Sequence, residues 1–528
     1  MRNFQQPGRS EAMSTRAMVA TSHGLATSAA LEILWAGGNA IDAAITAAAV
    51  LAVVEPTQTG IGGDCFALLK RNGEPVLALN GSGWAPQDAS LEHYQSKGIT
   101  SINSYSADAI TVPGSIAAWY TLSRDHGRLD FERLLEPAIR AAENGYPVTE
   151  RLARDWALRE GQFLHCENFV KVFYPNKKAL SVGDLHRQPL LAKALKSIAK
   201  DGPDVFYKGW IADDILETVQ SLGGLHQKSD FAEFNPEYVN PISVNYRGYE
   251  IWECPPSGQG IITLAIAKIL EKFDLATLDP LGTERFHIQA EAARVAYAER
   301  DLFLCDPKHH PVPVDYLLSD ERAQKVADKI KASERLTNLE QIPHSIHADT
   351  VYISVVDDEG MSVSLINSIF DDFGSAILTP KSGIILNNRG SGFSLEKNHP
   401  NCIHGRKRPM HTIIPAMLTY DNETVMSFGV TGAHYQPMGQ IQILTNIIDF
   451  GMGVQEAIDY PRFFARDDSF EVECTVPEAT IQGLRRLGHN VTLTANPLGT
   501  AQAIWIDRES GVLKGGADSR RDGCALGY

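Results

Sequence analysis

A threonine at the start of an apolar, β-branched run is the residue whose position most clearly suggests chemistry. Thr350 directly precedes the run at 351–356, and a polar segment at 338–349 precedes Thr350. If the bond between Asp349 and Thr350 breaks, the threonine becomes a chain N-terminus with its α-amine beside its own hydroxyl. A free α-amine has a pKa of about 7.7–8.0, so it can act as the base that activates the hydroxyl. The pattern therefore predicts a chain that cuts itself and then uses Thr350 as a nucleophile. The alternative is a threonine that only begins a strand.

The composition excludes several classes of function. The chain has 528 residues, of which 44% are hydrophobic and 21% charged, which is typical of a globular protein with a large core. The net charge of −16 and the lack of a basic run with interleaved aromatic residues argue against a nucleic-acid partner. Seven widely spaced cysteines without a Cys-x-x-Cys pair favour reduced thiols. We therefore expect a cytoplasmic protein. The apolar run at 43–54 is too short to span a bilayer, so we expect no membrane partner.

The pattern of apolar residues predicts helices mainly before Thr350 and strands mainly after it. The predicted elements are helices at 26–36, 40–54, 261–273, 283–303, 321–335, 440–450, 454–459 and 478–487, and strands at 65–69, 75–79, 246–252, 351–356, 362–367, 384–386, 412–420, 425–429 and 501–507. The glycine turn at 60–64 leads into the hairpin formed by the strands at 65–69 and 75–79, so it is a poor candidate for binding a nucleotide. This order favours a layered body with antiparallel sheet over alternating βαβ units.

Several separate segments resemble the γ-glutamyltranspeptidase family. They occur in the family's order at 37–44, 60–64, 111–114, 255–260, 350–357, 383–388, 407–409 and 517–523. The resemblance covers nearly the whole chain and implies the α+β fold class, specifically the αββα four-layer sandwich of the N-terminal nucleophile hydrolase type. It also implies a precursor that cuts itself into a large subunit (1–349) and a small subunit (350–528), which together form one intertwined structural domain. In this scheme Thr350 attacks the carbonyl of Asp349. We further expect a dimer of these heterodimers.

The resemblance also assigns catalytic roles to residues near Thr350. Ser368 occupies the position whose hydroxyl contacts the nucleophile, where the family usually has threonine. The family's oxyanion hole uses two consecutive backbone N–H groups of a Gly-Gly pair, and the corresponding donors here are expected to be Tyr435 and Gln436. Backbone donors survive a change of side chain, although tyrosine narrows the pocket. For Ser368, an ordinary strand or turn serine is the alternative.

The positions that bind the substrate depart from the family's pattern. The carboxylate-binding arginine falls on Ser82, the amine-binding acid or amide and a nearby aspartate on Arg389 and Gly392, an assisting asparagine on Phe370, and a serine pair on His411 and Thr412. An arginine fork suits a carboxylate, whereas an ammonium group needs acceptors or negative charge. Phe370, Tyr435 and Trp84 are expected to reduce the volume of the site. A substrate with a carboxylate, without an α-ammonium and smaller than glutamate fits these changes. Arg389 as a solvated or ion-paired arginine, and His411 as a packing residue, are the alternatives.

The exchanged residues fit the oxamate amidohydrolase branch of the family best, which would link the chain to purine breakdown. The predicted reaction is a self-cleaving threonine amidohydrolase that converts oxamate to oxalate and ammonia. The alternatives are a γ-glutamyl hydrolase or transpeptidase, a glutaryl or cephalosporin-type acylase, and a non-catalytic binder of small carboxylates. No cofactor motif is present. We expect no metal, because His309 and His310 are adjacent in a loop and do not share a helix face.

Overall fold

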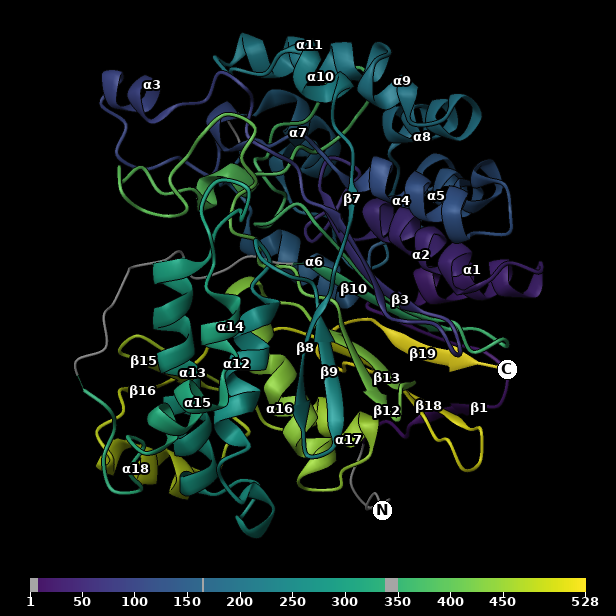
Figure 1. Ribbon diagram of the computed structural model, residues 1–528. Coiled ribbons are helices and arrows are strands. Elements are labelled where there is room, and N and C mark those ends of the chain that lie inside the picture. Colours follow the sequence, from purple (N-terminus) through teal and green to yellow (C-terminus); the bar gives the residue numbers. More distant parts are fainter. Residues whose placement is uncertain (1–7, 164–165, 338–349) are drawn as a thin grey trace.

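Two antiparallel sheets lie face to face at the centre of the molecule (Figure 1). The computed structural model describes residues 8–163, 166–337 and 350–528. Within these residues, the first seven-stranded sheet runs in the order β19 (Cys524–Gly527), β2 (Met18–Thr21), β10 (Val351–Val356), β11 (Ser362–Ser368), β3 (Asp64–Lys70), β4 (Leu77–Gly81), β7 (Glu237–Val239). The second seven-stranded sheet runs in the order β1 (Ala12–Ser14), β18 (Leu513–Ala517), β17 (Ala501–Ile506), β13 (Glu423–Val430), β12 (Ala416–Tyr420), β9 (Tyr249–Glu253), β8 (Ile242–Tyr246).

Strand β10 is buried on both faces, which explains why all of its residues except Ser354 are apolar or aromatic. Side chains alternate along a strand, so neighbouring residues face opposite sides of the sheet. Val351, Ile353 and Val355 belong to the core shared with the helices outside the first sheet. Tyr352 belongs to the core between the two sheets, where it joins Phe66.

Helices cover the outer face of each sheet and complete four layers. On the first sheet these are α1 (Gly24–Trp35), α2 (Ala40–Val54) and α4 (Ser115–His126), and α5 (Phe131–Asn144) packs on α2. On the second sheet they are α12 (Gly260–Leu270) and α16 (Gln436–Ile448), and α13 (Thr283–Phe303) packs on α12. The αββα sandwich and the α+β class predicted from the sequence are therefore confirmed. Among the described residues, no helix is long and apolar enough to cross a bilayer.

Helix α2 shows how the sequence places a helix against the nucleophile strand. Asn39 caps its N-terminus by accepting hydrogen bonds from the backbone of Ile41 and Asp42, and Asp42 bonds back to Asn39. The Ala40 N–H donates to the Asp357 carboxylate just beyond β10 (2.9 Å). The alanine-rich helix is buried along its whole length, because small side chains allow close packing on β10 and β11.

Both sheets combine strands from before and after Thr350. Strands β10 and β11 lie between β2 and β3, so the strand that carries the nucleophile is central in its sheet. Strands β12 and β13 likewise pair with β9 on one side and β17 on the other. The described parts of 1–349 and 350–528 therefore share both cores.

Apart from ends that shift by a few residues, three predicted elements differ from the structure. The strand expected at 246–252 is a hairpin of β8 and β9, turning at Arg247 (φ 52°) and Gly248 (φ 90°). Arginine seldom adopts positive φ, so the pair gave little sign of a turn. The helix expected at 321–335 ends early, as α15 (Asp320–Ala327), and the strand expected at 384–386 forms only isolated bridges.

Candidate active site

Thr350, which directly precedes β10, lies opposite Ser368 at the end of β11. The register of β10 and β11 pairs Val351 with Asn367, which brings the two hydroxyls together. Thr350 Oγ1 donates a hydrogen bond to Ser368 Oγ (3.3 Å), and Thr350 is 1% exposed. Ser368 Oγ also accepts from the backbone N–H of Phe370 (2.9 Å). Asp349, the residue predicted on the other side of the cut, lies outside the described residues.

The Arg389 side chain contacts the same serine from the segment that follows β11 in the chain. It begins the 3₁₀ turn η4 (Arg389–Gly392), and its side chain is buried. One terminal nitrogen donates to Thr412 Oγ1 (2.8 Å) and the other to Ser368 Oγ (3.4 Å). Burial lowers the pKa of Arg389 to about 10, while the Asp64 carboxylate opposes this, so the guanidinium is charged at neutral pH. Arg389 is therefore not a solvated loop residue.

The aromatic ring of Phe370 packs against the guanidinium group of Arg389. The Arg389 side chain lies 4.1 Å from the centre of the Phe370 ring, a distance at which a cation is attracted by the aromatic face. Phe370 has a φ of 83°, which is unfavourable for a residue with a bulky side chain. Its backbone bond to Ser368 Oγ and the bond from Asp371 N–H to Asn388 Oδ1 (3.0 Å) fix this conformation.

His411 holds Asp64 and has no donor left for a substrate. Its Nε2–H donates to Asp64 Oδ2 (3.0 Å), because Nδ1 accepts the backbone N–H of Ile413 (3.3 Å). Burial, together with the nearby Arg389, lowers the pKa of His411 to about 4, although Asp64 opposes the shift. The imidazole is therefore neutral at pH 7, and its ring lies tilted against Phe66 with 4.8 Å between the ring centres. These contacts argue against His411 as a direct donor to the substrate, because both ring nitrogens are engaged within the protein.

Asp64 is a site residue that the sequence analysis missed. Its Oδ2 lies 3.8 Å from Arg389 Nε, and its Oδ1 accepts the backbone N–H of Gly83 (2.8 Å). It stands at the end of the glycine turn at 60–64, which was interpreted only as the start of a hairpin. The available sequence signal was that Asp64 ends the segment 60–64, one of the segments that resemble the family.

Ser82 lies beside this network without entering it directly. Its hydroxyl donates to the Gly83 carbonyl (3.3 Å), and its own carbonyl accepts from Arg408 Nε (2.9 Å). These contacts connect Ser82 to Asp64 through Gly83. A direct role of Ser82 in substrate binding stays a prediction.

In the turn before α16, one of the two expected oxyanion donors is already hydrogen-bonded within the turn. The Tyr435 N–H donates to the Gly432 carbonyl (2.9 Å), so the prediction that it is a free donor was wrong. The Tyr435 ring turns into the core and packs against Phe464. Gln436 does approach the nucleophile, but through its side chain, whose Nε2 lies 3.5 Å from Thr350 Oγ1. A backbone role of Gln436 stays a prediction.

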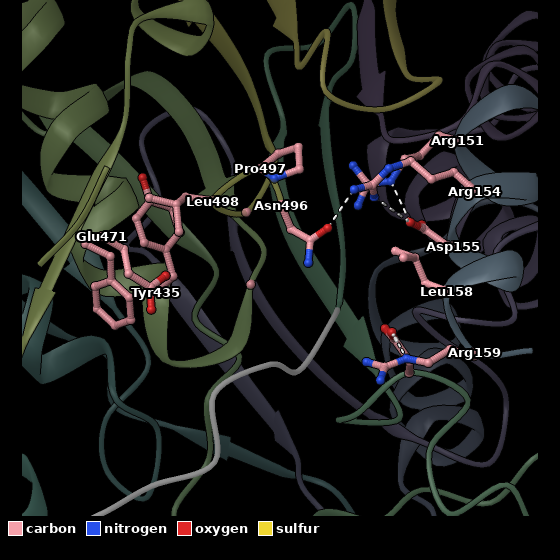
Figure 2. Close-up of a pocket in the computed structure, with 14 residues that line it drawn as sticks. Arg151, Arg154, Asp155, Leu158, Arg159, Tyr435, Glu471, Asn496, Pro497 and Leu498 are labelled. Atoms are coloured by element: carbon pink, nitrogen blue, oxygen red, sulfur yellow. Dashed lines mark hydrogen bonds and ion pairs between the residues drawn. The ribbon is translucent and has the colours of Figure 1, made fainter. Parts of the chain in front are cut away.

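Two cavities flank this turn. The first has a volume of about 220 Å³, and Figure 2 shows Arg151, Arg154 and Arg159 facing Tyr435 and Glu471 across it. The three arginines lie on or just after α6 (Glu150–Leu158), and Arg154 donates to Asn496 Oδ1 (2.6 Å). The second cavity has a volume of about 380 Å³ and is bordered by Phe370, Gly392 and His434.

One cluster has the residue types of a metal site. His287, Glu291 and His489 are buried, with ligand atoms within 4.8 Å of one another. However, His287 Nε2–H donates to the Lys331 carbonyl (2.8 Å), so the proton between the two rings belongs to His489 and points at His287 Nδ1 (2.8 Å). Arg294 donates to the Glu291 carboxylate (2.7 Å), and its charge opposes a cation. The cluster therefore fits a hydrogen-bonded anchor for the segment 331–336 better than a metal.

Comparisons with known proteins agree with this architecture. A family model described as gamma-glutamyltranspeptidase matches residues 26–528. The chain is 36% identical to the glutathione hydrolase-like YwrD proenzyme of Bacillus subtilis (strain 168), over 97% of this chain and 98% of that protein. It is also 36% identical to the oxamate amidohydrolase proenzyme of Klebsiella pneumoniae, over 98% and 99%. The crystal structure of cephalosporin acylase from Bacillus halodurans superposes with a TM-score of 0.94 at 38% identity, covering 100% of this chain and 99% of that one. The chain therefore belongs to the γ-glutamyltranspeptidase family and is an N-terminal nucleophile hydrolase of amide bonds.

Proposed function

We propose that the chain cuts itself between Asp349 and Thr350 and then hydrolyses a small amide whose carbonyl carbon is bonded to a carboxylate. Oxamate is the simplest such compound, and its products are oxalate and ammonia. A relative named oxamate amidohydrolase, with 36% identity over nearly the full length of both chains, supports the proposal.

One observation carries this choice of substrate. The hydroxyl of Thr350 and the guanidinium of Arg389 both contact Ser368 Oγ, so only two hydrogen bonds separate nucleophile and cation. In oxamate the carboxylate is attached directly to the carbon under attack, and its binding group must therefore lie beside the nucleophile. In a γ-glutamyl amide the α-carboxylate is several carbon atoms away. Arg389 is thus placed for the shorter substrate.

The chemistry proposed for each residue follows from these positions. The Thr350 α-amine takes the hydroxyl proton as Thr350 Oγ1 attacks the amide carbon, and the same amine returns the proton to the departing ammonia. Ser368 holds the hydroxyl in position, and Arg389 binds the carboxylate. Water then attacks the ester that remains on Thr350 and releases oxalate.

The negative charge on the attacked carbonyl oxygen needs backbone donors. Because Tyr435 N–H is engaged, we assign this role to the amides of Gly432 and Ala433, the consecutive pair in this turn that most resembles the family's Gly-Gly. Gly432 has a φ of 105° and Ala433 a φ of 47°. Two neighbouring residues in left-handed conformations turn the chain sharply just before α16.

A second candidate is an acylase for a longer acyl group or a larger leaving group. The likeness to cephalosporin acylase from Bacillus halodurans and the 380 Å³ cavity beside Phe370 favour it. A γ-glutamyl hydrolase is a third candidate, in which the buried Asp371 carboxyl, which accepts from Asn388 Nδ2 (2.8 Å), would bind the ammonium group. A binder without activity is the fourth.

A panel of primary amides separates these candidates with one readout, the release of ammonia. Purified, self-cleaved protein is given oxamate, glutaramate or glutamine, with Thr350→Ala as the inactive control. We expect kcat/KM for oxamate to exceed the other two by at least about 100-fold, as for a site built around one polar group of its substrate. Faster release from glutaramate would favour the acylase, and faster release from glutamine would overturn the interpretation of Arg389. Release from none, together with saturable oxalate binding, would favour the non-catalytic binder.

The subunit organisation is part of the same proposal. The cut would give chains of 1–349 and 350–528, and both chains contribute strands to each of the two sheets. We expect these chains to stay together after cleavage, to pair into a dimer of heterodimers, and to work in the cytoplasm.

A further inference from the structure

Gln259 is a fully buried amide that joins two parts of the active site. It lies in the loop between β9 and α12, and its side chain is 0% exposed. Its Nε2 group donates to the carbonyls of Thr412 (2.8 Å) and Ala433 (2.7 Å). An amide nitrogen carries two hydrogens, so both are used.

The two carbonyls belong to different functional groups of the site. Thr412 is the residue whose hydroxyl accepts from the Arg389 guanidinium. Ala433 lies in the turn assigned above to the oxyanion. The backbone N–H of Gln259 also donates to the His411 carbonyl (2.9 Å), so the loop is fixed to the Arg389 side at two points.

A buried arginine fixes the orientation of the Gln259 amide. Arg300, on α13, donates from Nη1 to Gln259 Oε1 (3.0 Å) and to His434 Nδ1 (2.9 Å). Arginine can only donate, so the oxygen of Gln259 must face it and the nitrogen must face the two carbonyls. Tyr297 adds a bond from its hydroxyl to the His434 carbonyl (2.6 Å). The turn is thus held from one side by α13.

Ala433 needs such support because its backbone is strained. Left-handed φ values are costly for alanine and persist only where the surroundings hold them. The Gly432 carbonyl is held by Tyr435 N–H, and the Ala433 carbonyl is held by Gln259. Both peptide groups that flank Ala433 are therefore fixed, and the one that contains the Ala433 carbonyl depends on Gln259.

We propose that Gln259 is a positioning residue that aligns the oxyanion turn with the Arg389–Thr412 side of the site, in self-cleavage and in amide hydrolysis alike. The inference rests on the role proposed above for Gly432 and Ala433. Gln259 does not touch the substrate itself. Its loss is expected to impair the attack step and to leave carboxylate binding nearly unchanged.

The test compares Gln259→Glu with a matched control, Gln442→Glu. Glutamate keeps the acceptor for Arg300 but replaces the donor with an oxygen that repels both carbonyls. Gln442 is a buried amide on α16 that bonds to both backbone groups of Phe463 (2.7 and 3.3 Å) and contacts neither side of the site. Gln259→Glu thus loses two buried bonds from an amide to a carbonyl, and Gln442→Glu loses one.

Self-cleavage is followed on a gel over time, and kcat and KM for oxamate are measured per cleaved molecule. In Gln259→Glu we expect self-cleavage and kcat to fall by about 10- to 100-fold, as for a small displacement of catalytic groups. KM and inhibition by oxalate should stay within about threefold of the unchanged protein, as for a group that acts mainly in the transition state. Gln442→Glu should behave like the unchanged protein.

Equal losses in both variants, a loss confined to KM, or unchanged rates in Gln259→Glu would overturn the proposal. Gln259→Met, which lacks any charge, is the second variant and should show the same split between kcat and KM. If both Gln259 variants fail to fold, the residue is structural and the proposal is wrong. Self-cleavage needs no added substrate, so this test remains decisive even if the unchanged protein releases no ammonia from oxamate.

Discussion

Thr350 donates a hydrogen bond to Ser368 across 3.3 Å, from the start of one central strand to the end of its neighbour. Removing the acceptor in Ser368→Ala is expected to slow self-cleavage and hydrolysis by about 100-fold, in the range of a lost group that assists proton transfer. Ser368→Thr keeps the hydroxyl and should retain most of the activity. Rates are read from gels and from ammonia release. Equal rates in the alanine and threonine variants would show that the hydroxyl is not used.

Arg389 should determine which substrates bind, because its charge is buried and its contacts are polar. In Arg389→Lys the charge remains but the planar fork is lost, and in Arg389→Gln both are lost. We expect kcat/KM for oxamate to fall by at least about 30-fold in the glutamine variant, as when one partner of a buried charge pair is removed, with a smaller fall in the lysine variant. Oxalate inhibition should weaken in the same order. An unchanged inhibition constant in Arg389→Gln would place the carboxylate elsewhere.

The pH dependence of the rate should reflect the α-amine of Thr350 and not His411. The amine acts as a base only when neutral, so kcat/KM should rise with pH through a midpoint near the pKa of an α-amine, about 7.7–8.0. His411 has its pKa lowered to about 4 by burial and is neutral across this range. In His411→Gln, which can still donate to Asp64, the midpoint should not move. A midpoint near pH 6.5 that disappears in this variant would assign the base to His411.

The apolar pattern predicted the nucleophile strand, whereas the four layers and the contact between Ser368 and Thr350 were predicted from the resemblance to the family. Long α13 was predicted with its observed bounds, since its interior lacks glycine and proline. The network of Asp64, Gln259 and Arg300 was missed for a physical reason. These polar residues lie in segments that are remote in sequence, and only packing shows which buried donor meets which acceptor. The assignment of the Tyr435 N–H as an oxyanion donor failed for a similar reason. Its hydrogen bond to the Gly432 carbonyl cannot be predicted from the residue types in the turn.

Acid should destabilise the fold because buried neutral histidines become protonated when the chain unfolds. His226 allows this effect to be measured at a single residue. Burial lowers the pKa of His226 to about 4, against 6.5 in an exposed histidine. Between these values the unfolded chain binds a proton that the folded chain does not, so stability is complete above pH 6.5 and is lost as the pH falls. At pH 5 this one residue should cost about 2 kcal/mol relative to pH 7.

His226→Phe removes that proton while keeping a ring beside Phe231. Urea unfolding at pH 7 and at pH 5 should show a smaller loss of stability in the variant than in the unchanged protein. Identical losses would mean that the imidazole is already charged in the folded state.

The most direct test of the central claim is the mass of the chains after purification and incubation. If Thr350 is the attacking residue, the protein should separate under denaturing conditions into chains of 1–349 and 350–528, the second beginning with threonine. Thr350→Ala should remain a single chain of 528 residues without amide hydrolysis. An uncut protein that still hydrolyses amides, or a new N-terminus at any other residue, would contradict the account.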